Sequence, residues 1–154
     1  MQIAELETQK RSLQGMLNNL VGKFAEHQLA NEFRSRKRFT LSAFFQGVQD
    51  ESKLNVVDVW ERVSLQRDNG KRMEIDVLAE SSCGRVVLVE VKKTKTKTRL
   101  KAVEGFDEKV IVYARQFPDK TILPAFLSLG GFTRQAMRSC REQNIGTAER
   151  IAYF

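Results

Sequence analysis

Residues 72–92, with the sequence RMEIDVLAESSCGRVVLVEVK, decide the fold of this 154-residue chain. Residues 72–80 and 86–91 are rich in apolar and β-branched side chains, and a short segment that contains Gly84 separates them. This pattern predicts two antiparallel strands joined by a turn at residues 81–85. The second strand contains the unbroken apolar run VVLV at residues 86–89, which is typical of a central strand covered on both faces.

Charged side chains occupy three positions in this predicted hairpin. Asp76 lies in the first strand, and Glu90 and Lys92 lie near the end of the second. Because successive side chains of a strand point to opposite faces, Glu90 and Lys92 share one face while the neighbouring valines point to the other. Pairing across residues 82–84 brings Asp76 alongside Glu90. The sequence therefore predicts two carboxylates and an ammonium at the point where a buried strand emerges.

The buried acids of this hairpin need a compensating charge. A divalent cation is one source, since Mg²⁺ prefers carboxylate and water oxygens. Such an ion would polarise a scissile phosphate and acidify a bound water, while the lysine would orient that water or stabilise the developing charge. The alternative is an ordinary cross-strand ion pair of Asp76 and Glu90 with Lys92 or Lys71, which contributes little at an exposed surface. The single histidine excludes a site that needs two imidazoles. Two cysteines are too few for a disulfide scaffold or a thiolate metal site.

The flanking sequence predicts alternating helices and strands. A helical pattern runs to Phe33 and is followed by a basic run, an apolar segment, a strand at residues 56–60 and an Asn-Gly turn at residues 69–70. After the hairpin we expect a helix over 103–117, a strand over 121–129, a helix over 132–143 and a closing strand over 151–154. Trp60 and Phe117 are expected in the core. The order predicts an α/β fold with a mixed central sheet flanked by helices.

The hairpin motif resembles the core of a known nuclease family. Residues 74–76 (EID), the short turn and residues 90–92 (EVK) are similar to the motif of the PD-(D/E)XK nuclease superfamily, which has the restriction-endonuclease-like fold. Isoleucine precedes Asp76 where the motif has proline, a common variation. Residues 127–133 (LSLGGFT) are similar to the strand-to-helix step of that fold. The resemblance covers most of residues 20–154.

This resemblance implies a set of catalytic residues. Asp76 and Glu90 would bind the metal, which is Mg²⁺ with Mn²⁺ as a substitute, and Lys92 would be the catalytic lysine. Members often add a glutamate from the first core helix, and Glu26 fits that role, with Glu32 as its rival. The implied catalytic set is therefore Asp76, Glu90, Lys92 and Glu26, and its three acids would be the metal ligands.

Residues 1–19 lie outside the resemblance and predict a separate helical extension. Apolar side chains fall on a heptad a/d register, with Lys10 at an otherwise apolar position. They are Ile3, Leu6, Leu13, Leu17, Leu20 and Phe24. The stripe either pairs two chains or packs along its own domain, and we expect it to form a homodimer. The chain thus divides into an extension at residues 1–19 and a nuclease-like domain at residues 20–154.

The charge of the chain favours a polyanionic partner. Lysine and arginine number 26 against 19 acids, giving a net charge of +7. A basic run alone is more typical of a solvated loop, but the run that directly follows the hairpin favours a phosphate-binding track. The residues expected to bind nucleic acid, expected to be DNA, are Lys93, Lys95, Lys97, Arg99, Lys101, Arg36 and Lys37. No segment approaches the roughly 20 apolar residues that span a bilayer, and no signal peptide is evident, so we expect a cytoplasmic protein without membrane contact.

Taken together, these patterns and the resemblance predict an Mg²⁺-dependent endonuclease, structure-specific or resolvase-like, that hydrolyses phosphodiester bonds in DNA. The sequence contains no obvious recognition helix and no cluster of stacking aromatics that would predict base readout. The alternative is a catalytically silent nuclease-fold module that binds nucleic acid or serves protein assembly. Metal binding that depends on Glu90 would favour the enzyme, and its absence would favour the module.

Overall fold

The computed structural model describes residues 24–151 of the chain. Residues 24–36 are helical, and a short strand, a 3-10 helix and a long hairpin follow before strands and helices alternate. The bounds are β1 Arg38–Phe39, η1 Leu41–Ala43, β2 Leu54–Gln66, β3 Arg72–Ser81, β4 Arg85–Lys92, α2 Leu100–Gln116, β5 Thr121–Ser128, α3 Arg134–Glu142 and β6 Gly146–Ala148.

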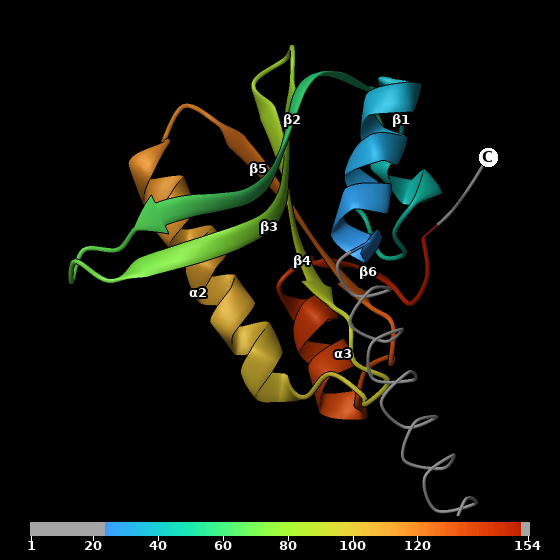
Figure 1. Cartoon of the computed structure of the whole chain (residues 1–154), viewed down its shortest axis with the longest axis vertical. Helices are drawn as coiled ribbons and strands as arrows, with labels where there is room; N and C mark the ends of the chain where they lie inside the picture. Colours follow the sequence, from blue (N-terminus) through green and yellow to red (C-terminus); the bar gives the residue numbers. More distant parts are fainter. Residues whose placement is uncertain (1–23, 152–154) are drawn as a thin grey trace, which may run out of the picture.

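The six strands form one mixed sheet, in the order in which they occur along the chain. Neighbours from β1 to β4 are antiparallel, whereas β4, β5 and β6 run parallel to one another. A parallel pair requires a crossover connection, and α2 and α3 supply the two crossovers (Figure 1). This topology confirms the predicted α/β fold with a mixed central sheet flanked by helices.

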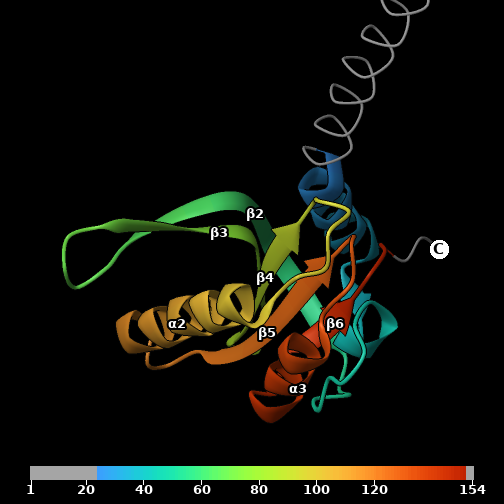
Figure 2. The same ribbon diagram turned by 90° about the horizontal axis from the view of Figure 1, so that it is seen from below.

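Two hydrophobic cores cover the two faces of the sheet. On one face, Phe33 of helix 24–36 belongs to the same buried cluster as Val89 of β4. On the other face, Phe106 of α2 belongs to a cluster with Leu88 of β4. Figure 2 shows α2 and α3 together on one side of the sheet and helix 24–36 on the other. Strand β4 is therefore the doubly covered central strand that its apolar run predicts.

The β2–β3 hairpin changes from one core to the other along its length. Val77 of β3 packs in the core under helix 24–36, whereas Ile75, two residues earlier, packs in the core of α2. The change coincides with Arg62 of β2, whose φ of 54° interrupts the extended backbone. An irregularity of this kind bends and twists a strand. The distal part of the hairpin therefore lies beside α2 (Figures 1 and 2). Asp76 is the residue of β3 between Ile75 of one core and Val77 of the other.

The closing strand and two aromatic side chains differ from the sequence predictions. Strand β6 is Gly146–Ala148, which pairs with β5, whereas Ile151 is not in a strand and residues 152–154 lie outside the described part. Trp60 is 43% exposed because Val59, next to it in β2, takes the inward position. Phe117 is 39% exposed and ends α2, with its ring 4.6 Å from that of Tyr113.

The predicted extension at residues 1–19 also lies outside the described part of the chain. Phe24, which belongs to the same apolar stripe, is described, and its side chain is 52% exposed. Across residues 24–151, no helix combines the length and the apolar character needed to cross a membrane.

Candidate active site

Asp76 and Glu90 lie side by side across the β3–β4 hairpin. Val77 pairs with Val89, so the next position of this antiparallel register sets Asp76 opposite Glu90. The Oδ2 atom of Asp76 accepts a hydrogen bond of 2.7 Å from the backbone N–H of Val91. Burial raises the pKa of Asp76 to about 7, with a further rise from the neighbouring Glu90 and a smaller one from Glu26. Because the two carboxyl groups lie this close together, the negative charge of Glu90 disfavours ionisation of Asp76.

Glu90 is buried and has an ion-pair partner that the sequence did not reveal. The Nζ atom of Lys109, from α2, lies 3.1 and 3.3 Å from the two carboxylate oxygens of Glu90. Lys109 also donates a hydrogen bond of 2.8 Å to the carbonyl oxygen of Glu74. The partner of Glu90 is thus neither Lys92 nor Lys71. Helical spacing was the available signal, since Lys109 lies one turn after the buried Phe106.

Glu26 enters the site from helix 24–36. Its carboxylate is buried, and each of its two oxygens has a cationic partner. Lys93 Nζ lies 3.1 Å from Oε1, and Arg62 Nε donates a 3.2 Å hydrogen bond to Oε2. The charge of Glu26 contributes to the raised pKa of Asp76, whereas its rival Glu32 pairs with Arg36 at 4.0 Å within the same helix. The geometry therefore groups Glu26, and not Glu32, with the hairpin acids.

Lys92 is the last residue of β4, and its side chain is exposed. Strand alternation places it on the same face as Glu90. Among the residues that the structure describes, no ion-pair partner of Lys92 occurs. Its ammonium is therefore available to a ligand that approaches the acids, unlike those of Lys93 and Lys109.

The cations at ion-pair distance in this site pair with two of its three acids, Glu26 and Glu90. Within residues 24–151, no three histidine, cysteine or acidic side chains form a ready-made metal cage. The donor chemistry nevertheless fits a hard divalent cation, because Asp76 and Glu90 are adjacent carboxylates and the pKa of Asp76 is raised by burial and by nearby negative charge. Asp76 is also the one site acid without a cation at ion-pair distance in this described part. An added cation would satisfy that unbalanced acid.

The basic segment after β4 is tied to the body of the protein. Thr98 is buried, and its hydroxyl lies 2.7 Å from that of Ser128, while its N–H donates to the carbonyl of Gly131 at 2.8 Å. Gly130 packs so closely that any side chain there would collide with the carbonyl of Thr96. The segment is consequently held in place and is not a freely solvated loop.

The cations predicted to bind nucleic acid differ in their exposure to solvent and in their ion pairs. Lys95, Lys97, Arg99 and Lys101 are exposed on and after this segment. Lys93 is half-buried and paired with Glu26. Arg36 pairs with Glu32 and lies over the ring of Phe44 at 5.9 Å, and Lys37 is exposed.

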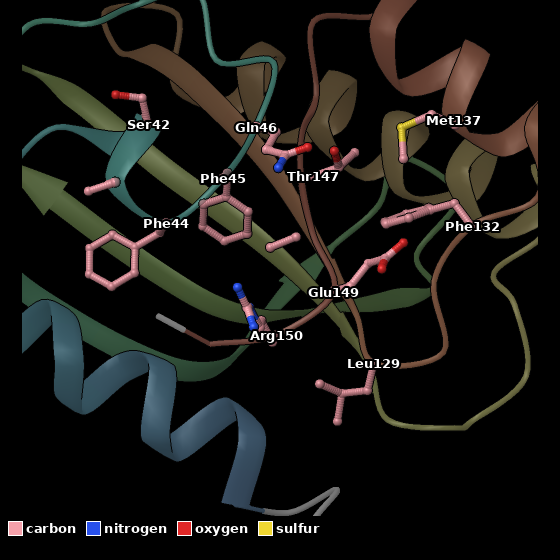
Figure 3. A pocket seen from close by; sticks show the side chains of 12 residues that line it. Ser42, Phe44, Phe45, Gln46, Leu129, Phe132, Met137, Thr147, Glu149 and Arg150 are labelled. Atoms are coloured by element: carbon pink, nitrogen blue, oxygen red, sulfur yellow. The ribbon is translucent and has the colours of Figure 1, made fainter. Parts of the chain in front are cut away.

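A separate open cavity of about 700 Å³ lies between η1, β6 and α3. Figure 3 shows Phe44 and Phe45 on one side of it and Phe132 and Met137 on the other, with Glu149 between them. None of the four predicted catalytic residues lines this cavity. The acidic site and this cavity are therefore distinct features of the structure.

Comparisons with known proteins show which solved structures have a similar fold. No family model and no curated protein match the chain. Among solved structures, it is similar to Can2 from Sulfobacillus thermosulfidooxidans in complex with cyclic tetra-adenylate, with 17% identity and a TM-score of 0.56 over 84% of this chain and 32% of that one. A repair endonuclease from Pyrococcus abyssi has 15% identity and a TM-score of 0.43, over 58% and 38%. EndoMS in a complex with dsDNA has 19% identity and a TM-score of 0.41, over 60% and 38%.

These similarities concern the fold, and the chain spans less than half the length of each of these three solved chains. The match to Can2 and the observed strand order agree with the architecture that the motif predicts. The protein has a restriction-endonuclease-like fold.

Proposed function

We propose that this protein is a divalent-cation-dependent nuclease that hydrolyses phosphodiester bonds in DNA. The observation that carries this proposal is the pair of adjacent carboxylates, Asp76 of β3 and Glu90 of β4, beside the exposed Lys92 that ends the doubly covered strand β4. The raised pKa of Asp76 supports it, because perturbed acids next to one another are typical of functional sites.

In this proposal Asp76, Glu90 and Glu26 hold Mg²⁺, with Mn²⁺ as a substitute. The bound ion would supply Lewis acidity for the scissile phosphate and for a water nucleophile. The side chains have their own tasks. The N–H of Val91 fixes the Asp76 carboxylate, which must lose its proton before it can act as a ligand. The Lys92 ammonium donates hydrogen bonds to the attacking water or to a phosphate oxygen that gains charge.

The substrate would be bound through its backbone. The exposed cations Lys95, Lys97, Arg99 and Lys101 lie on and after the segment that leaves the site. Contacts of lysine and arginine with phosphates provide affinity and fix the position of the duplex, but they carry no sequence information. We therefore propose a nuclease that acts on DNA of a particular structure, such as a four-way junction or a flap, in preference to one that recognises a base sequence.

Cleavage assays with site variants test this function. Wild-type protein should cut at least one of duplex, single-stranded, flap and four-way DNA in Mg²⁺ or Mn²⁺, and EDTA should stop the reaction. Asp76→Asn and Lys92→Ala should lower the rate at least about 100-fold, while circular dichroism shows an intact fold. Lys120→Ala, far from the acids in sequence and on the turn before β5, is the matched control. If wild type cuts none of these substrates, the proposed nuclease is wrong.

A catalytically silent module is the second candidate, and one observation favours it. Glu26 and Glu90 are already neutralised by lysine and arginine side chains of the protein itself. A fold that uses these pairs only for stability would need no metal. Calorimetric titration with Mn²⁺ separates the candidates: binding that is lost in Glu90→Gln supports the enzyme, and equal heats for both proteins support the module.

A further inference from the structure

Glu26 binds two cations that reach it from solvent-exposed parts of the molecule. Its own side chain is 6% exposed, whereas the side chains of Arg62 and Lys93 are 56% and 31% exposed. Each cation takes one carboxylate oxygen, so both oxygens of Glu26 are occupied. A buried acid thus holds two side chains that remain partly exposed to solvent.

Arg62 is held at this position by an unusual backbone. Its φ of 54° lies in the left-handed region, which a residue with a long side chain rarely adopts. In the register of β2 and β3 it falls between the pairs Glu61–Val77 and Val63–Ile75, so it lies opposite Asp76. Glu26 raises the pKa of Arg62 most, and Glu74 and Asp76 raise it further. The guanidinium is therefore set among the acids of the site.

Lys93 connects the same carboxylate to the basic segment. It follows Lys92 directly and precedes the exposed Lys95, Lys97 and Arg99. Carboxylates and phosphates are recognised by the same donors, lysine as a point charge and arginine as a planar fork. A DNA phosphate near the end of β4 would consequently compete with Glu26 for both cations.

We propose that Glu26 retains Arg62 and Lys93 in the free protein and that both side chains bind DNA phosphates once the charge of Glu26 is neutralised. The inference rests on the proposed function because it requires the chain to bind DNA. It adds Arg62 to the nucleic-acid-binding residues and gives Lys93 a second role. A divalent cation that binds Glu26 releases the two side chains, so metal and DNA bind cooperatively, each strengthening the other by the same factor.

DNA binding by Glu26→Gln in EDTA at pH 8 tests the proposal without metal and without cleavage. Fluorescence anisotropy with a short labelled duplex gives the affinity across a series of salt concentrations. Two added phosphate contacts should make the slope of log K against log salt more negative by about 1 to 2 and tighten binding about 10-fold at 0.1 M salt. Asp58→Asn is the matched control, because it removes an exposed acid of β2 that lies outside the site and holds no cation among the described residues, and it should change affinity about twofold or less.

A second set of variants keeps the test decisive if Glu26→Gln does not fold. In the otherwise wild-type chain, Arg62→Ala should reduce the salt slope less than Lys97→Ala, since Lys97 is exposed and unpaired within the described residues whereas Arg62 is already occupied. Where Glu26→Gln does fold, Arg62→Ala with Lys93→Ala in that background should remove the whole gain in affinity.

The outcomes separate this inference from the proposed function. Three results overturn the inference while DNA binding and cleavage by wild type stand. They are equal tightening by Glu26→Gln and Asp58→Asn, a gain that survives loss of both cations, and an Arg62→Ala effect as large as that of Lys97→Ala. Absence of DNA binding in every variant, wild type included, overturns both.

Discussion

Replacing Asp76 with asparagine removes a half-buried carboxyl group whose pKa is raised from 3.8 to about 7. Burial is the main cause of the rise, and the adjacent Glu90 adds to it. Between these two pH values the folded protein binds more protons than the unfolded chain. The stability of metal-free wild type therefore decreases as the pH rises from about 4 to about 7, and this contribution is constant above that range. Asparagine does not ionise, so the variant should lack this decrease.

The size of the effect follows from the pKa difference. One pKa unit corresponds to about 1.4 kcal/mol, so the whole change from 3.8 to about 7 amounts to about 4 kcal/mol at most. Part of this range lies below pH 5, and water screens part of the interaction because the side chain is only half-buried. We expect the advantage of Asp76→Asn over wild type to grow by about 1 to 2 kcal/mol between pH 5 and pH 8.

Urea denaturation in EDTA measures this difference. Trp60, the single tryptophan, lies in β2 and reports unfolding by fluorescence. Asp119→Asn, at an exposed turn, is the control and should follow wild type at both pH values. Mg²⁺ should then stabilise wild type at pH 8 but not Asp76→Asn, since a ligand that binds only the folded state stabilises it. A difference between Asp76→Asn and wild type that does not change with pH would refute the account of Asp76.

Three further predictions address neighbouring features. Lys109→Met leaves buried Glu90 without its cation, so the free energy of unfolding in EDTA at pH 8 should fall by about 1 to 3 kcal/mol by urea denaturation, and Mg²⁺ should recover part of the loss. Lys101→Met, exposed on the same helix, should change little; a loss equal to that of Lys109→Met would contradict the ion-pair argument. Gly130→Ala should collide with the Thr96 carbonyl and lower stability by about 1 to 3 kcal/mol in thermal unfolding, whereas Gly105→Ala, which has open space within α2, should be neutral or stabilising. Leu17→Glu should convert the proposed homodimer to a monomer by sedimentation, and a monomeric wild type would disprove the pairing.

The hairpin at residues 72–92 could be predicted from sequence because its information is local. A two-residue side-chain period and a short turn together fix which residues face each other, so Asp76 falls opposite Glu90 once the turn is placed. The apolar run of β4 likewise indicates a strand covered on both faces, and this in turn requires helices on both sides. The restriction-endonuclease-like architecture follows from that order of elements.

Other features depended on strands and helices that are distant in sequence. Strand β6 is three residues long, and only its pairing with β5 defines it, so apolar pattern alone misplaced the closing strand at residues 151–154. Trp60 is exposed because Val59 takes the inward position of β2, which the apolar pattern of residues 56–60 alone does not decide. No sequence pattern predicts the left-handed Arg62 within the same strand.

The ion pairs around the acids show most clearly which features follow from the sequence and which depend on the tertiary structure. The sequence by itself determined which carboxylates meet in the hairpin, because neighbours along a strand and across a tight turn are fixed by backbone geometry. Only the tertiary structure decided which cations meet them: Arg62 is 36 residues from Glu26, and Lys109 is 19 residues from Glu90. Such pairs arise when a bent hairpin and two helices pack on a common sheet, and a long flexible side chain can reach any acid that this packing brings within range.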